Sequence, residues 1–244
     1  MQGLLASLDR RWRRNRNDMA PLRWQTCLFI TVNAVIISMA LLDSAVGEKR
    51  ISAPVHTLGR MLTDFGESGW IICVSAFLLF EGWAACHLVR SIRCRCQAVQ
   101  ISRIGGYLLT SIALSGLIAN LLKRAIGRAR PGHYDELGAF FFSPFHGRAS
   151  FESFPSGHAT TIGAFFVALS LLFPRYRIIF LALALWLGMT RVMVGAHYPS
   201  DVIAGLALGG WFSFMTAIVY SRYGLLFRTG PDGWPLPRHS LSWK

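Results

Sequence analysis

The sequence predicts an all-α membrane protein, a bundle of six transmembrane helices with both termini in the cytoplasm. Only 15% of the 244 residues are charged and 53% are hydrophobic, whereas an ordinary soluble domain carries about 25% charged residues. Six apolar segments approach the roughly 20 residues that a helix needs to cross a bilayer. They lie at 24–46, 68–89, 104–122, 156–174, 178–196 and 200–221. Such segments must be helical, because an unpaired backbone group finds no water inside the bilayer.

The chain begins with a basic segment, residues 1–23. It contains Arg10, Arg11, Arg13, Arg14, Arg16 and Arg23. The apolar segment after it is longer than the apolar part of a signal peptide and has no clear small-residue cleavage site. We therefore expect an uncleaved first helix and three parts of the chain. These are a basic cytoplasmic segment 1–23, a transmembrane domain 24–221 and a cytoplasmic tail 222–244.

Lysine and arginine are divided unequally between the two sides of this bundle. The formal net charge is +13, and most of the basic clusters fall on the side of the N-terminus, at 10–23, 90–103, 175–177 and 222–244. The positive-inside rule assigns that side to the cytoplasm. A nucleic-acid-binding protein would carry its charge over one polar face, so no nucleic-acid partner is predicted. The five cysteines form neither a disulfide framework nor a zinc pattern, and no metal is predicted.

Three short strings place charged or ionisable residues at the ends of apolar segments on the predicted external side. A charge beside a membrane segment lowers stability, so such residues usually have a function. The first runs from Lys123 to Arg130 and Pro131. Lys123 and Arg130 share a face if the helix continues, whereas Gly127 permits a bend and Pro131 disfavours helix at Arg130. Two long cations can thus converge on one anion. A basic cluster at a helix end is more often an interfacial anchor.

The second string, Pro155-Ser156-Gly157-His158, directly precedes the fourth apolar segment. Free N–H groups at a helix start bind anions, and the helix dipole favours this. Ser156 can cap the helix or donate to a phosphate oxygen, and Gly157 allows the backbone to approach closely. His158 would then stand beside the anion as a general acid. The alternative is a plain helix cap with an incidental histidine.

The third string runs from Thr190 to Asp201. Arg191 interrupts an apolar segment, which calls for an anionic partner. His197 and Asp201 are four residues apart, so their side chains can meet across one helical turn. A carboxylate on one ring nitrogen fixes the tautomer and leaves the other nitrogen free to attack. A buried core histidine beside a helix-start aspartate is the structural alternative for this pair.

In this order and on one membrane face, the strings resemble the type 2 phosphatidic acid phosphatase (PAP2) superfamily. Its signature is Lys-x6-Arg-Pro, then Pro-Ser-Gly-His, then Ser-Arg-x5-His-x3-Asp. Every position matches except Thr190, which stands where serine is usual and keeps the hydroxyl. The motifs cover residues 123–201, and the six-helix plan covers the chain. The resemblance implies a multi-pass protein of the bacterial inner membrane whose active site faces the periplasm.

The resemblance also implies hydrolysis without a metal or cofactor. His197 would attack phosphorus and form a phosphohistidine, and Asp201 would orient His197 and stabilise its positive charge. His158 would protonate the leaving oxygen and then activate water. The phosphoryl oxygens would be held by Lys123, Arg130, Ser156, Gly157 and Arg191. Arg148 and His146 are further candidates for contact with the substrate head group.

The predicted partners are a lipid phosphate substrate and the bilayer, with no required protein partner. The substrate candidates are the 1-phosphate of lipid A, undecaprenyl pyrophosphate and phosphatidylglycerol phosphate, and the likeness of the 145–160 region favours lipid A. A lipid phosphotransferase, which passes the phosphoryl group to another lipid, is a related alternative. A transporter of anionic lipids is the non-enzyme alternative, and it leaves His158 and the His197–Asp201 pair unexplained.

Overall fold

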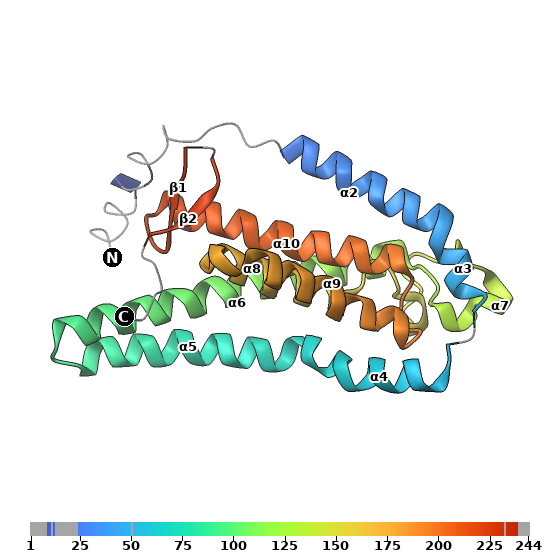
Figure 1. The fold of residues 1–244 in the computed structure, drawn as a ribbon, viewed down its shortest axis with the longest axis horizontal. Coiled ribbons are helices and arrows are strands. Elements are labelled where there is room, and N and C mark those ends of the chain that lie inside the picture. The colour runs from blue at the N-terminus through green and yellow to red at the C-terminus, as the bar shows by residue number, and fades with distance from the viewer. Residues whose placement is uncertain (1–8, 11, 13–23, 50, 232, 239–244) are drawn as a thin grey trace.

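The computed structural model describes residues 9, 10, 12, 24–49, 51–231 and 233–238, so the predicted segment 1–23 lies almost wholly outside the described residues. The described chain forms an elongated helical bundle with a small β-hairpin near one end (Figure 1). The predicted all-helical class is confirmed, apart from this hairpin.

The first apolar segment is one helix in three parts. They are α2 (Trp24–Ser38), a π-helical turn η1 (Met39–Asp43) and α3 (Ser44–Gly47). Apolar side chains along it, such as Phe29 and Leu41, are exposed, as suits a helix whose neighbours are lipid tails. Among its described side chains, Ser38 and Asp43 are the buried ones. The helix packs against α10 (Pro199–Arg222).

The second and third segments form a long antiparallel pair. It comprises α4 (Ala53–Thr63), η2 (Asp64–Gly66), α5 (Ser68–Leu88) and α6 (Ile92–Ile126). Helix α4 was not predicted, and α6 begins well before residue 104. Residues 92–103 contain no glycine or proline and several good helix formers. This arginine-rich stretch therefore continues the helix instead of forming a loop.

Helix α8 (Gly157–Leu172) lies in the middle of the bundle against α6, α9 (Arg177–Met193) and α10. Glycines let α8 and α10 approach closely, because a Cβ atom at Gly209 would overlap the backbone carbonyl of Thr160. Close packing also joins their N-terminal ends, where the Ser156 N–H donates to the Asp201 carbonyl at 3.0 Å. The second and third strings are thereby held side by side.

Five helical stretches of the described chain are long and apolar enough to cross a membrane. The remaining predicted segment, the fourth, is α8, which has 16 residues and rises about 24 Å, less than the hydrocarbon core of about 30 Å. The count of six transmembrane helices therefore stays a prediction.

The C-terminal residues fold onto the bundle. Strand β1 (Phe227–Thr229) pairs antiparallel with β2 (Pro235–Pro237), and Phe227 packs in the core with Tyr107 of α6. No secondary structure was predicted in this tail. The hairpin lies far from the end of the bundle that carries α3 and α7 (Tyr134–Leu137), where the loops of the three strings gather (Figure 1). Short 3-10 turns complete the chain: η3 (Pro131–His133), η4 (Ala149–Phe151) and η5 (Pro174–Tyr176).

Candidate active site

The first string does not continue as a helix. Helix α6 ends at Ile126, and Gly127 takes the left-handed conformation with φ 65°, which glycine adopts without steric cost. Lys123 thus occupies the last helical turn, while Arg128 and Arg130 follow the reversal. A Cβ atom added at Gly157 would lie 3.1 Å from the Lys123 Nζ. Lys123 therefore lies beside the second string from the end of α6, and the bend, not a shared helical face, determines where Arg130 lies.

His197 is buried, with 2% of its surface exposed, and its Nδ1 lies 2.9 Å from the backbone oxygen of Ser153. A carbonyl oxygen only accepts, so Nδ1 carries the proton and Nε2 keeps a free lone pair. Burial lowers the pKa of His197 to about 4, against the opposing effect of Asp201, and the charges of Arg130 and Lys123 lower it further. At neutral pH the imidazole is therefore uncharged.

Asp201 does not make the hydrogen bond that the sequence suggested, because its Oδ2 lies 3.7 Å from His197 Nδ1. It acts on His197 through its charge. Its oxygens accept from Arg128 Nη1 at 2.6 Å, from Ser153 Oγ at 2.5 Å and from the Tyr198 N–H at 2.9 Å. Ser153 therefore fixes both functional side chains, one with its carbonyl and the other with its hydroxyl.

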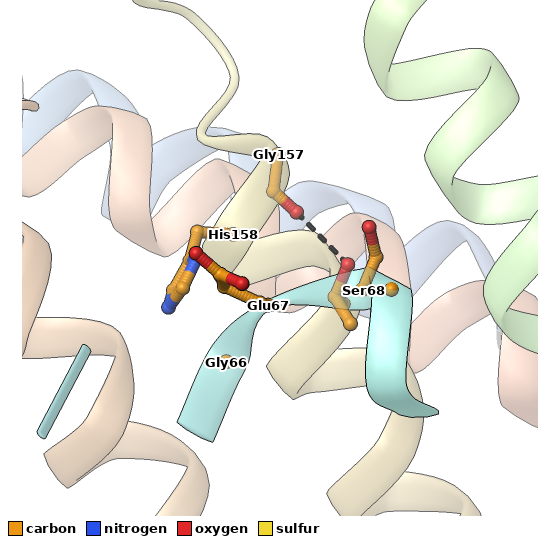
Figure 2. Close-up of a pocket in the computed structure, with 7 residues that line it drawn as sticks. Gly66, Glu67, Ser68, Gly157 and His158 are labelled. Carbon is orange, nitrogen blue, oxygen red and sulfur yellow. Dashed lines mark hydrogen bonds between the residues drawn. The ribbon is translucent and has the colours of Figure 1, made fainter. Parts of the chain in front are cut away.

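His158 lies in the first turn of α8, next to the connection between α4 and α5. Its Nε2 is 3.4 Å from Thr63 Oγ1, and that hydroxyl also accepts from Arg191 Nη1 at 2.9 Å. Figure 2 shows His158 and Gly157 from α8 beside Gly66 and Glu67 in a pocket of about 260 Å³. The pocket is lined by Gly66, Glu67, Ser68, Gly69, Gly157, His158 and Thr161.

The cations of the first and third strings, Lys123, Arg130 and Arg191, form one positively charged cluster. The Nε atoms of Arg130 and Arg191 are buried and have no hydrogen-bond partner among the described residues. A buried donor without a partner costs about 1–3 kcal/mol, so two such donors call for an explanation. Burial also lowers the pKa of Arg130, which Glu152 and Asp201 oppose. A bound oxyanion would pair these donors and offset the repulsion between the cations.

The two hydroxyl residues of the strings have local partners. Ser156 is the cap of α8 and accepts from the Ala159 N–H at 3.4 Å. Thr190 Oγ1 donates to the Leu187 carbonyl at 2.6 Å and lies 3.5 Å from Thr63 Oγ1. The threonine therefore retains a hydroxyl hydrogen bond.

Two further residues were predicted to contact the substrate head group. Arg148 and His146 are both exposed, and neither lines the pocket beside His158. The His146 ring packs 4.1 Å from that of Phe151, and its Nδ1 is 3.1 Å from Ser143 Oγ. Their contact with a head group stays a prediction.

Four residues at the site were not singled out from the sequence. They are Asp43, Thr63, Arg128 and Ser153. A carboxylate in an apolar segment, as at Asp43, was a usable signal. The role of Thr63 and Ser153 depends on contacts between distant parts of the chain, which no local pattern announces.

Comparison with known proteins identifies the family of this chain. Residues 104–224 match the PAP2 superfamily, and the chain belongs to that superfamily. It is 60% identical to the lipid A 1-phosphatase of Rhizobium johnstonii over 98% of both chains. It is 63% identical to the lipid A 1-phosphatase of Rhizobium etli over 90% of this chain and 95% of that one. The predicted class, a membrane lipid phosphatase that hydrolyses phosphate esters, is confirmed.

A solved structure shares the fold. It is the first transmembrane PAP2-type phosphatidylglycerolphosphate phosphatase from Bacillus subtilis, with a TM-score of 0.51 and 21% identity over 79% of this chain and 91% of that one. At this identity the likeness concerns the arrangement of helices alone.

Proposed function

We propose that this protein removes the 1-phosphate of lipid A at the periplasmic face of the bacterial inner membrane, through a phosphohistidine on His197. The observation that carries the chemistry is the neutral imidazole whose Nδ1–H donates to the Ser153 carbonyl. The near-full-length identity to two lipid A 1-phosphatases supports the substrate.

In the first step, the lone pair of His197 Nε2 forms a bond to phosphorus while the bond from phosphorus to the lipid oxygen breaks. His158 gives a proton to that leaving oxygen. Lys123, Arg130 and Arg191, together with Ser156 and the Gly157 N–H, hold the other phosphoryl oxygens. Asp201 stabilises the charge that develops on the imidazole. Because phosphoryl transfer depends mainly on positioning and charge stabilisation, these fixed groups suffice without a metal.

In the second step, His158 takes a proton from water, and the water oxygen bonds to phosphorus as the N–P bond breaks. His197 returns to its neutral form, and inorganic phosphate leaves. Water is the acceptor in this proposal, which separates it from a lipid phosphotransferase.

The pocket beside His158 supports a sugar as the leaving group. Its lining offers a carboxylate at Glu67, a hydroxyl at Ser68 and backbone amides at three glycines. Such groups hydrogen-bond the hydroxyls of a glucosamine ring, whereas an acyl or prenyl chain would need an apolar wall.

The arrangement of the chain supports the proposed topology. The loops of the three strings lie at the end of the bundle that carries α3 and α7, while the C-terminal hairpin lies at the other end (Figure 1). With the arginine-rich N-terminal segment on the cytoplasmic side, six crossings place both termini in the cytoplasm and the site in the periplasm.

The test is phosphate release by the purified protein in detergent with EDTA and no acceptor lipid. The panel contains lipid A with only the 1-phosphate, lipid A with only the 4′-phosphate, undecaprenyl pyrophosphate and phosphatidylglycerol phosphate. We expect release from the first alone or at the highest kcat/KM. Preference for another lipid would contradict the substrate, and strict dependence on added divalent metal would contradict the mechanism.

A matched pair of variants tests the nucleophile. His197→Ala should lose nearly all turnover and all acid-labile phosphoenzyme, because no other group forms the covalent intermediate. His87→Ala, an exposed histidine in the last turn of α5, should keep the activity of the wild type. Near-normal turnover in His197→Ala would refute the assignment.

A further inference from the structure

Asp43, Arg128 and Asp201 form a buried chain of charges that runs from the first helix to His197. Arg128 Nη2 lies 2.7 Å from Asp43 Oδ2, and Nη1 lies 2.6 Å from Asp201 Oδ1. All three side chains are 0% exposed. Ser200 joins the chain, since its hydroxyl donates to Asp43 at 2.5 Å and its backbone N–H does so at 3.1 Å. The first helix thereby touches the catalytic apparatus at one point.

Arg128 is held on every side. Its Nε and Nη2 donate to the Ala139 carbonyl at 3.1 and 2.8 Å, and its Nη1 donates to Ser200 Oγ at 2.8 Å. The Tyr198 ring lies 4.4 Å from its guanidinium carbon. A guanidinium so placed cannot turn towards a substrate. It serves as a fixed link between the two carboxylates.

The charge balance of this chain is uneven. Arginine stays protonated in proteins, so two ionised carboxylates and one guanidinium leave a net charge of −1. Burying a charge without compensation is costly. The charged groups that act on His197 are Asp201 on one hand and Arg130 and Lys123 on the other. A single Arg128–Asp201 pair would cancel most of the carboxylate's attraction for a cationic imidazole, and Asp43 prevents this.

The position of Asp43 argues against a mere packing role. It is the last residue of the π-helical turn η1, and such turns often occur at functional sites. The helix around it is largely exposed, and an ionisable side chain in an apolar segment is retained at a cost in stability. An apolar residue would pack there more cheaply.

We propose that Asp43 is a positioning residue for the reaction: by binding Arg128, it leaves the negative charge of Asp201 available to the phosphorylated His197. This inference rests on the proposed phosphohistidine chemistry. It assigns a function to the first transmembrane helix, which lies outside the three sequence motifs.

The test compares Asp43→Asn with Ser38→Ala, the other buried polar side chain of the same helix. Phosphate release and quenched phosphoenzyme formation are measured, with sites counted by vanadate binding. Asp43→Asn should lower kcat and the rate of phosphorylation about 10- to 100-fold, the usual cost of losing a group that supports a catalytic residue. KM should stay within about twofold, because the substrate contacts are intact. Ser38→Ala should match the wild type.

A second variant separates charge from structure. Asp43→Asn combined with Arg128→Gln restores the net charge of −1 and removes the cation that would otherwise neutralise Asp201. The double variant should turn over faster than Asp43→Asn. If the single variant does not accumulate in cells, the double variant is compared with the wild type instead, and its kcat should lie within about tenfold of the wild-type value. A purely structural role predicts that the second substitution makes matters worse.

Three results would overturn the inference. An Asp43→Asn kcat within about twofold of the wild type excludes the positioning role. A double variant slower than the single one, or, where only the double variant accumulates, more than about tenfold below the wild type, excludes the charge argument. A wild-type protein that forms no phosphoenzyme overturns the proposed function and this inference together, so the two failures are distinguishable.

Discussion

Replacing Asp201 by asparagine tests how the fold stabilises the charged intermediate. The substitution preserves size but removes the negative charge that lies 3.7 Å from His197 Nδ1. It also breaks a hydrogen-bond pattern, because the carboxylate accepts from Arg128, Ser153 and the Tyr198 N–H. An amide offers one accepting oxygen, so at least one of the buried donors loses its partner.

The expected magnitude follows from the distance. Two unit charges about 4 Å apart interact by about 4 kcal/mol at an effective dielectric constant near 20. If this attraction is present in the transition state and absent in the neutral ground state, kcat falls about a thousandfold. KM should change little, because Asp201 does not touch the substrate.

The assay is steady-state release of phosphate from lipid A 1-phosphate in detergent, with the melting temperature as a check on folding. A folded Asp201→Asn protein whose kcat falls less than about tenfold would refute the electrostatic role of this carboxylate. In that case the tautomer fixed by the Ser153 carbonyl would account for the activation of His197.

Three further outcomes are expected. The acid limb of kcat/KM, corrected for ionisation of the substrate, should lie near pH 4, because burial lowers the pKa of His197 to about 4 and only the neutral imidazole attacks. An acid limb near pH 6.5 in the rate profile would contradict this. Thr63→Val should lower kcat/KM about tenfold, since the hydroxyl accepts from Arg191 at 2.9 Å and such bonds contribute about 1.5–3 kcal/mol; an unchanged kcat/KM would show that the contact is idle. Vanadate should inhibit competitively, and Arg130→Gln should weaken its inhibition constant at least tenfold by the same estimate, whereas Arg124→Gln, 70% exposed, should leave it unchanged; equal effects of the two variants would contradict the assignment of Arg130.

The helical fold was largely predictable because the hydropathy of a segment shows whether lipid or water surrounds it. A segment surrounded by lipid or by other apolar helices must be apolar along its length, and all six predicted segments are helical. Their ends were less predictable. Helix α6 begins at Ile92 because arginine and glutamine favour a helix in water as well. The apolar segment therefore indicates the part of the helix within the membrane, and the helix itself is longer.

The cationic side of the candidate site was predictable because charged residues beside an apolar segment lower stability and so usually have a function. Lys123, Arg130 and Arg191 each place a cation against an apolar segment, and the sequence pattern registers that cost. Residues that position the two histidines were harder to predict from the sequence. Ser153 and Thr63 act through a carbonyl and a hydroxyl that become partners of His197 and His158 once the bundle has formed.

The charges of the site are arranged on two sides of the nucleophile. Lys123 and Arg130 lower the pKa of His197, whereas Asp201 raises it. In the proposed reaction the phosphoryl group brings negative charge to the cations, and the attack places positive charge on the imidazole, where the Asp43–Arg128–Asp201 chain supplies a net negative charge. This acidic chain is fixed by buried hydrogen bonds before the substrate arrives, so it needs little reorganisation during the reaction. This explains why a membrane-spanning bundle retains a buried aspartate in its first helix despite the cost of placing it there.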